Sequence, residues 1–175
     1  MSLLVVTGPP GAGKSTVARV LADRLERSVL VEGDAFFRFV RSGAIDPWLP
    51  GSDAQNLVVT QAAAEAAGRF SRGGFDTVYD GVVGPWFLAT FAAATGLDRL
   101  DYVMLLPNVE RCVERVARRR GHGFTDPDAT RHMHEQLASA EVDGRHVLLD
   151  PPDDVAEVVA LVRTQQDAGR LSVAG

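Results

Sequence analysis

The sequence predicts an α/β fold in three layers, in which a five-stranded parallel sheet lies between two layers of helices. Short apolar runs alternate with stretches of helical periodicity along all 175 residues, which is typical of such a sheet. The first apolar run leads at once into a glycine-rich turn and a helical pattern, as in a parallel strand–turn–helix unit. With 46% hydrophobic and 23% charged residues, the chain is expected to form one domain spanning 1–175.

The first half of the chain contains two predicted strands and three predicted helices. The run 2–7 is apolar enough for a buried strand, and the helix predicted at 14–27 places Val17, Leu21 and Leu25 on one side. An alanine-rich pattern predicts a long helix, for which Asp53 is the expected N-cap. The remaining elements expected here are a strand at 28–32, a short helix at 34–41, a loop at 43–51 and the long helix at 53–70.

The second half repeats the alternation. A proline opens the helix predicted at 85–95, a position where proline is tolerated. The last residues, 172–175, are expected to be frayed. The other expected elements are strands at 75–80, 102–106 and 146–149, and helices at 109–119, 127–140 and 153–168.

Eight residues after the first strand match the pattern G-x-x-x-x-G-K-[ST] without a mismatch. Glycines let successive N–H groups turn inward around phosphate oxygens, at a helix N-terminus whose dipole favours negative charge. Lys14 can reach the terminal phosphates, and the Ser15 hydroxyl can ligate Mg²⁺. The alternative, an ordinary glycine turn, is disfavoured by the strand and helix that flank the motif. The predicted nucleoside-triphosphate site consists of Gly8, Pro9, Pro10, Gly11, Ala12, Gly13, Lys14, Ser15 and Thr16.

Two carboxylates follow predicted strands, at Asp34 and Asp80. Ligands of open α/β sheets bind at the carboxyl ends of the strands, so both side chains are expected beside the phosphate loop. Each is a candidate for supporting Mg²⁺ or for accepting the proton of an attacking hydroxyl, and spacing does not separate the two roles. The alternatives are that Asp34 caps the short helix and that Asp80 is a turn residue before Gly81.

A basic segment at 110–124 is a candidate lid, placed at about 118–128. Arg115 and Arg119 are four residues apart and share one face of the predicted helix, where their guanidinium groups suit phosphate oxygens. The alternative is that the arginines at 118–120 only complement the dipole of the helix C-terminus. His122 is a candidate contact to phosphate or acceptor, whereas His132 and His134 are expected on a solvated helix.

The region at about 34–60 is the expected acceptor site, since aromatic and arginine side chains gather there. Core packing is the favoured interpretation for Phe36, Phe37 and Phe39, and Trp48 is expected to be half-exposed. The candidate acceptor contacts are Phe37, Arg38, Trp48, Asp80, Trp86 and His122.

Charge and cysteine content narrow the classes of function. A net charge of −5 argues against a nucleic-acid partner held by the whole domain. The single cysteine, Cys112, allows no internal disulfide and fits a reducing compartment, where a packed thiol is expected. The sequence shows neither a signal-peptide pattern nor an apolar run that could span a bilayer, so a cytoplasmic protein without a membrane partner is expected.

Four stretches of the sequence resemble those of the small P-loop kinases of metabolites, such as gluconate kinase, shikimate kinase, adenylate kinase and chloramphenicol phosphotransferase. The resemblance rests on the phosphate loop, on Gly33-Asp34, on the run Asp46-Pro47-Trp48-Leu49 and on the segment 115–124. It implies an adenylate-kinase-like P-loop fold with a small lid, and ATP and Mg²⁺ as cofactors. It further implies that Asp34 is the base, Arg115 packs on adenine, Arg119 reaches phosphate and the turn at Pro151 contacts adenine.

The resemblance ends at the acceptor. Gluconate kinases carry a Cys-Ser-Ala-Leu-Lys segment where this chain reads Tyr79-Asp80-Gly81-Val82-Val83. The expected function is therefore ATP-dependent phosphate transfer, catalysed by Lys14, Asp34 and Arg119, to a hydroxyl of a sugar, sugar acid, nucleoside or antibiotic. The alternatives are a P-loop ATPase or switch without an acceptor, and a polynucleotide 5′-kinase.

Overall fold

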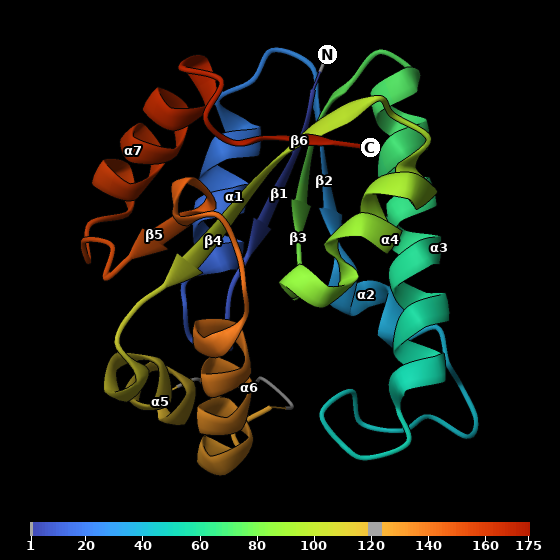
Figure 1. Cartoon of the computed structure of the whole chain (residues 1–175), viewed down its shortest axis with the longest axis vertical. Coiled ribbons are helices and arrows are strands. Elements are labelled where there is room, and N and C mark those ends of the chain that lie inside the picture. Colours follow the sequence, from blue (N-terminus) through green and yellow to red (C-terminus); the bar gives the residue numbers. More distant parts are fainter. Residues whose placement is uncertain (1, 119–123) are drawn as a thin grey trace.

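The computed structural model describes residues 2–118 and 124–175, and it has the three-layer α/β architecture that the sequence predicts. Five parallel strands lie in the order β2-β3-β1-β4-β5, with β1 in the middle (Figure 1). Their bounds are β1 Leu3–Thr7, β2 Ser28–Glu32, β3 Asp76–Asp80, β4 Arg99–Leu106 and β5 Val147–Leu149.

The residues of β1 explain why the sheet is covered on both faces. Every residue of this strand is buried, and side chains alternate between the two faces. Leu3 and Val5 belong to one core cluster, whereas Leu4 and Val6 belong to the other. A strand with apolar residues at all these positions has no solvent-facing side, so helices must cover both faces of the sheet.

The helices form the two covering layers and a third group at the carboxyl ends of the strands (Figure 1). One face is covered by α1 (Lys14–Asp23) and α7 (Val155–Asp167), and the other by α3 (Asp53–Arg72) and α4 (Pro85–Thr95). The group below the strand ends consists of α2 (Gly33–Phe37), α5 (Val109–Ala117) and α6 (Pro127–Ser139), and a 3-10 turn, η1 (Gly144–His146), precedes β5.

The C-terminal residues do not fray as predicted. They form a sixth strand, β6 (Ser172–Ala174), which runs antiparallel to β4 with Val173 opposite Leu100. Leu171 just before it is fully buried, and the Gly175 N–H donates a hydrogen bond to the Asp98 carbonyl. Burial of Leu171 together with these backbone bonds offsets the entropy of ordering the tail, and the short sequence of residues 172–175 does not indicate these contacts.

Two further predictions of local structure are wrong. The N-cap of α3 is Ser52 rather than Asp53, and the Ser52 hydroxyl donates to the Pro47 carbonyl in the preceding loop instead of capping the helix. Phe39 was expected to pack in the core but is 69% exposed, and it lies two residues beyond the end of α2 at Phe37. Within the described residues, the helices are too short or too polar to cross a bilayer.

Candidate active site

The phosphate loop, residues 8–15, is held tightly against its neighbours. Gly11 has φ +82°, and a side-chain carbon there would overlap the carbonyl oxygen of Cys112 in α5. At Gly8, φ +142°, such a carbon would overlap the carbonyl oxygen of Leu105 in β4. The Lys14 ammonium group donates to the Pro9 carbonyl at 3.1 Å, which folds the side chain back over the loop. Only glycine combines these backbone angles with this close approach, so both positions require glycine for the curvature of the loop.

Asp80 ends β3, directly beside the phosphate loop, because β3 pairs with β1 and places Asp80 opposite Val6. The side chain is 8% exposed, and within the described residues its Oδ1 atom has no hydrogen-bond partner. Burial raises the pKa of Asp80, while a hydrogen bond from the Ser15 side chain and the charge of Lys14 oppose the rise. A buried carboxylate oxygen without a partner, next to the Ser15 hydroxyl, is a donor set that fits Mg²⁺.

Asp34 lies in the first turn of α2 and is exposed. The helix has Glu32 as its N-cap and no side-chain capping bond, so the alternative in which Asp34 caps the helix is wrong. Asp34 is close enough to Asp80 for its charge to raise the pKa of that carboxyl. The structure thus brings together two carboxylates in unlike environments, one buried and one open to solvent.

Sequence analysis missed Tyr79, which lies beneath both strand ends. Its ring stacks edge-to-face on Phe91, with centroids 4.8 Å apart. A side-chain carbon on Gly33 or Gly81 would overlap the Tyr79 ring or hydroxyl, so both turns pack directly on this side chain. Burial, together with the charges of Asp34 and Asp80, raises the pKa of Tyr79 above its ordinary value, and the phenol stays protonated. The position of Tyr79 next to Asp80 in the sequence was the signal that could have identified it as a site residue.

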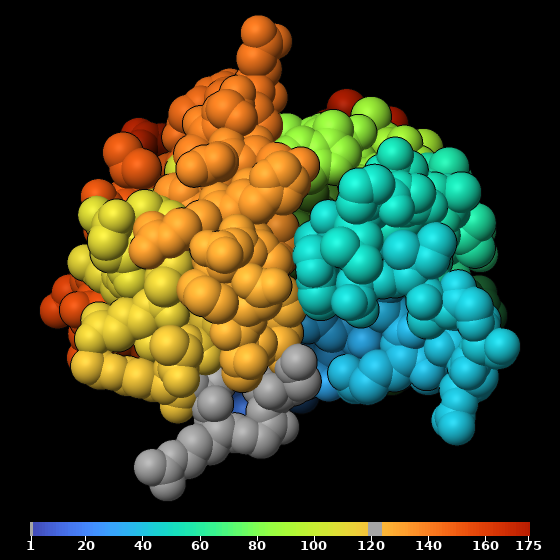
Figure 2. Space-filling model, turned by 90° about the horizontal axis from the view of Figure 1, so that it is seen from below, coloured from blue at the N-terminus to red at the C-terminus, as the bar shows by residue number. Residues whose placement is uncertain are grey.

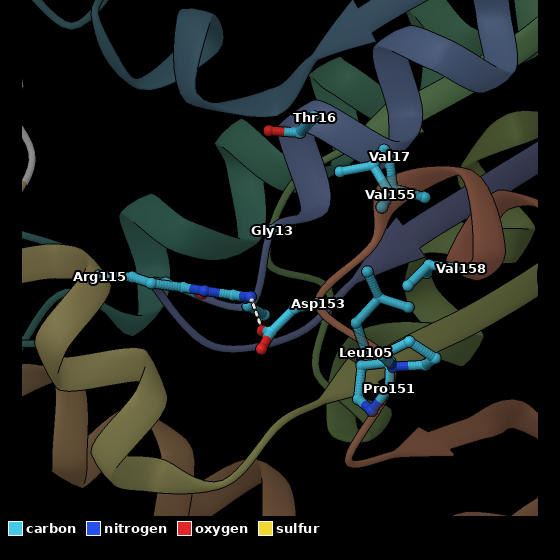
Figure 3. Close-up of a pocket in the computed structure, with 12 residues that line it drawn as sticks. Gly13, Thr16, Val17, Leu105, Arg115, Pro151, Asp153, Val155 and Val158 are labelled. Atoms are coloured by element: carbon cyan, nitrogen blue, oxygen red, sulfur yellow. Dashed lines mark hydrogen bonds and ion pairs between the residues drawn. The ribbon is translucent and has the colours of Figure 1, made fainter.

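A pocket of about 230 Å³ opens on the other side of the phosphate loop (Figure 3). The structure brings Arg115 and Pro151, far apart in sequence, together with Gly13 and Thr16 around this pocket. Val155 and Val158 of α7 line it as well, and neither was identified from the sequence. An arginine, aliphatic side chains and a phosphate loop around one cavity suit a flat base attached to a triphosphate.

Trp48, in the predicted acceptor region, is partly buried, as predicted. Its ring packs edge-on against Phe124, with centroids 4.8 Å apart. The loop carrying Trp48 is fixed to α3, because the Ser52 hydroxyl and the Asn56 amide both donate to the Pro47 carbonyl, at 2.9 and 2.8 Å. Figure 2 shows a hollow between α6 and the start of α3, with blue atoms of the N-terminal part of the chain at its floor.

The other predicted acceptor residues are scattered over this end of the molecule. Phe37 is partly buried at the end of α2, Arg38 is exposed, and Trp86, in the first turn of α4, is 50% exposed. Arg119 and His122 lie outside the described residues, as does most of the first half of the predicted lid.

The predictions for His132, His134 and Cys112 concern how far each side chain is buried. His132 is exposed, as expected, but His134 is partly buried and its Nε2 atom donates to the Pro107 carbonyl at 2.7 Å, so its assignment to a solvated face was wrong. The Cys112 side chain is buried, as predicted for a packed thiol. In the part of the chain that the structure covers, His, Cys, Asp and Glu form no cluster of three that could hold a metal ion.

Comparison with known proteins assigns the chain to a protein family. The AAA domain family matches residues 3–143, and the chain belongs to it. A comparison with curated proteins gave no match.

Solved structures with the same fold are kinases in several cases. A sugar kinase from Janibacter sp. HTCC2649 is 20% identical, with a TM-score of 0.73 and coverage of 95% of both chains. A gluconokinase from Sinorhizobium meliloti 1021 is 21% identical, with a TM-score of 0.72 and coverage of 97% of this chain and 93% of that one. The tunicamycin resistance protein of Deinococcus radiodurans is 17% identical, with a TM-score of 0.69 and coverage of 94% and 95%. The chain therefore has a P-loop kinase-like fold.

Proposed function

We propose that this protein transfers the γ-phosphate of ATP to a hydroxyl group of a small molecule, with Mg²⁺ as the metal. The observation that carries the proposal is the pair of unlike carboxylates beside the phosphate loop. Asp80 is buried with an unpartnered oxygen next to Ser15, whereas Asp34 is exposed. When two titratable groups of one site have opposite environments, they serve opposite roles. A site built only to bind a triphosphate needs no second, exposed carboxylate.

The buried carboxylate suits the metal. Ser15 and Asp80 would hold Mg²⁺, Asp80 directly or through water. The bound ion would neutralise charge on the phosphate oxygens. Lys14 and the N–H groups of the phosphate loop would hold the β- and γ-phosphates, and the base and ribose would occupy the pocket at Arg115 and Pro151.

The exposed carboxylate suits proton transfer. Asp34 would accept the proton of the acceptor hydroxyl as the oxygen attacks phosphorus, which requires access from solvent for the acceptor. Arg119, outside the described residues, is proposed to neutralise charge in the transition state. The acceptor would lie in the hollow of Figure 2, in contact with some of Phe37, Arg38, Trp48, Trp86 and His122.

The other candidates that the sequence left open differ in the acceptor. An ATPase or switch uses water alone, and a polynucleotide kinase needs a basic track along the strand, which a net charge of −5 does not favour. The names of the sugar kinase and the gluconokinase of the same fold support a small polyhydroxylated acceptor.

The test is an assay of ATP consumption with a panel of sugars, sugar acids, nucleosides, hydroxylated antibiotics and an oligonucleotide with a 5′-hydroxyl. We expect one class of small molecule to stimulate turnover, Lys14→Ala to abolish it, and Asp34→Asn to abolish transfer while ATP still binds. A rate indifferent to the whole panel would favour the ATPase. Stimulation by the oligonucleotide alone would favour the polynucleotide kinase.

A further inference from the structure

The loop that follows β5 is tied to α5 by a series of polar contacts that surround the nucleotide pocket. The Asn108 N–H donates to the Asp150 carboxylate at 2.6 Å, and the Arg111 guanidinium donates to the Pro151 carbonyl at 2.8 Å. The Arg115 guanidinium donates to the Asp153 carboxylate at 2.7 Å. These contacts join segments about 40 residues apart in the sequence and fix both sides of the pocket.

Asp153 is the point where the two arginines converge. Its Oδ1 atom lies 2.7 Å from Arg115 Nη2 and 3.7 Å from Arg111 Nε. The two arginines are four residues apart on α5, so their side chains leave the same face of the helix. Figure 3 shows the Asp153 carboxylate directed at the end of Arg115, across the pocket from Val155 and Val158.

This ion pair adds little to the stability of the fold. The Asp153 side chain is 75% exposed, and exposed pairs contribute about 0–1 kcal/mol. Its effect on geometry is larger, because a free arginine side chain samples many rotamers. Here the guanidinium is held at one end by Asp153 and at the other by the Gly11 carbonyl, 3.4 Å from Nη1. Arg115 therefore lies fixed along the edge of the phosphate loop.

We propose that Asp153 is a positioning residue that presets the Arg115 guanidinium as one wall of the base pocket. This rests on the proposed function, since it assumes that the pocket takes a nucleoside triphosphate. A guanidinium plane already held in place stacks on a flat base without first losing side-chain entropy, and this increases affinity. Arg111 supports the arrangement by holding both the Asp153 carboxylate and the Pro151 carbonyl.

The neighbouring residue provides a matched control. Asp154 carries the same charge one residue later, but its carboxylate accepts the N–H groups of Ala156 and Glu157 and caps α7. Asparagine is also a good cap, so Asp154→Asn changes the local charge as Asp153→Asn does and keeps the helix. The two variants differ in the contact with Arg115.

The experiment compares ATP with inorganic tripolyphosphate by isothermal titration calorimetry on the full chain. Tripolyphosphate occupies the phosphate loop but has no base. We expect Asp153→Asn to raise the Kd for ATP about three- to tenfold, the range of a lost stacking contact, and to leave tripolyphosphate within about twofold. Asp154→Asn should leave both affinities unchanged. In an Arg115→Gln background, Asp153→Asn should cause no further loss.

Each other result overturns the proposal. Equal losses for both probes would mean that Asp153 acts on the phosphate loop, through Arg115 and Gly11. An unchanged ATP affinity would make the ion pair incidental, and a tighter one would make it a block of the pocket. Should Asp153→Asn unfold, Arg111→Gln provides the same comparison of probes with a smaller expected loss. A wild-type chain that binds neither probe would instead refute the proposed function itself.

Discussion

Replacing Gly11 by alanine tests whether the phosphate loop owes its shape to close packing against α5. Two costs follow from the structure. An alanine at φ +82° loses about 1–2 kcal/mol to the left-handed backbone. Its Cβ also overlaps the carbonyl oxygen of Cys112, a backbone atom inside α5 that cannot move aside by rotating a side chain, which adds about 1–3 kcal/mol. We expect Gly11→Ala to lose about 2–5 kcal/mol of unfolding free energy.

Gly43 provides the control, because it has φ +70° but, apart from its chain neighbours, no atom of the described residues lies within 4 Å of the position that a Cβ would take there. Gly43→Ala should therefore show the backbone cost alone, about 1–2 kcal/mol. Urea unfolding of both variants measures the difference. Any shift of α5 also moves Arg115, so ATP affinity should fall in Gly11→Ala and not in Gly43→Ala. Equal losses of stability in the two variants would refute the packing argument.

Three further predictions concern buried groups. Asp80→Asn should raise the free energy of unfolding at pH 7 by about 1 kcal/mol, because a buried charge is removed, and it should abolish Mg²⁺-dependent ATP binding. Urea unfolding measures the first effect, and calorimetry with and without Mg²⁺ measures the second. A destabilised variant would contradict the account. Burial lowers the pKa of His146, whose Nδ1–H donates to the Tyr102 carbonyl. The imidazole therefore binds a proton more readily in the unfolded chain, and the free energy of unfolding falls as the pH drops through about 6.5 and below. His146→Gln keeps a donor and should reduce the loss of stability between pH 7.5 and 5.5 by up to about 1 kcal/mol in urea unfolding, and an unchanged pH dependence would exclude His146 as its source. Leu171→Ala should cost about 2–5 kcal/mol, because the side chain is fully buried ahead of β6, whereas a frayed tail would show almost no change.

Most of the sheet was predictable because short runs rich in apolar residues alternate with helical patterns along the chain. The strand β2 and the helix α4 have the predicted bounds, and the other elements differ mainly at their ends. Helix ends depend on contacts that periodicity does not encode, as Ser52 shows by bonding to Pro47 instead of capping α3. The strand β6 was missed since a three-residue strand gains its stability from β4, not from its own sequence.

The candidate site also has parts that the sequence predicted and parts that it did not. Gly8 to Ser15 could be recognised because phosphate binding by backbone N–H groups requires a fixed spacing within one short segment. Asp34 and Asp80 could be identified as candidates from their places after strands, but their different burial could not. The contacts that Tyr79 and Asp153 make were not predictable, because each depends on a residue of another element, Gly33 in one case and Arg115 in the other.

The sequence by itself therefore determined the fold class, the phosphate loop and the end of the sheet at which the site lies, because these depend on local periodicity and spacing. Only the tertiary structure decided which carboxylate is buried, which side chains form the nucleotide pocket and that the C-terminal tail joins the sheet. These properties arise where segments far apart in the chain meet. Burial and ion pairing there depend on three-dimensional packing, and no single stretch of residues specifies them.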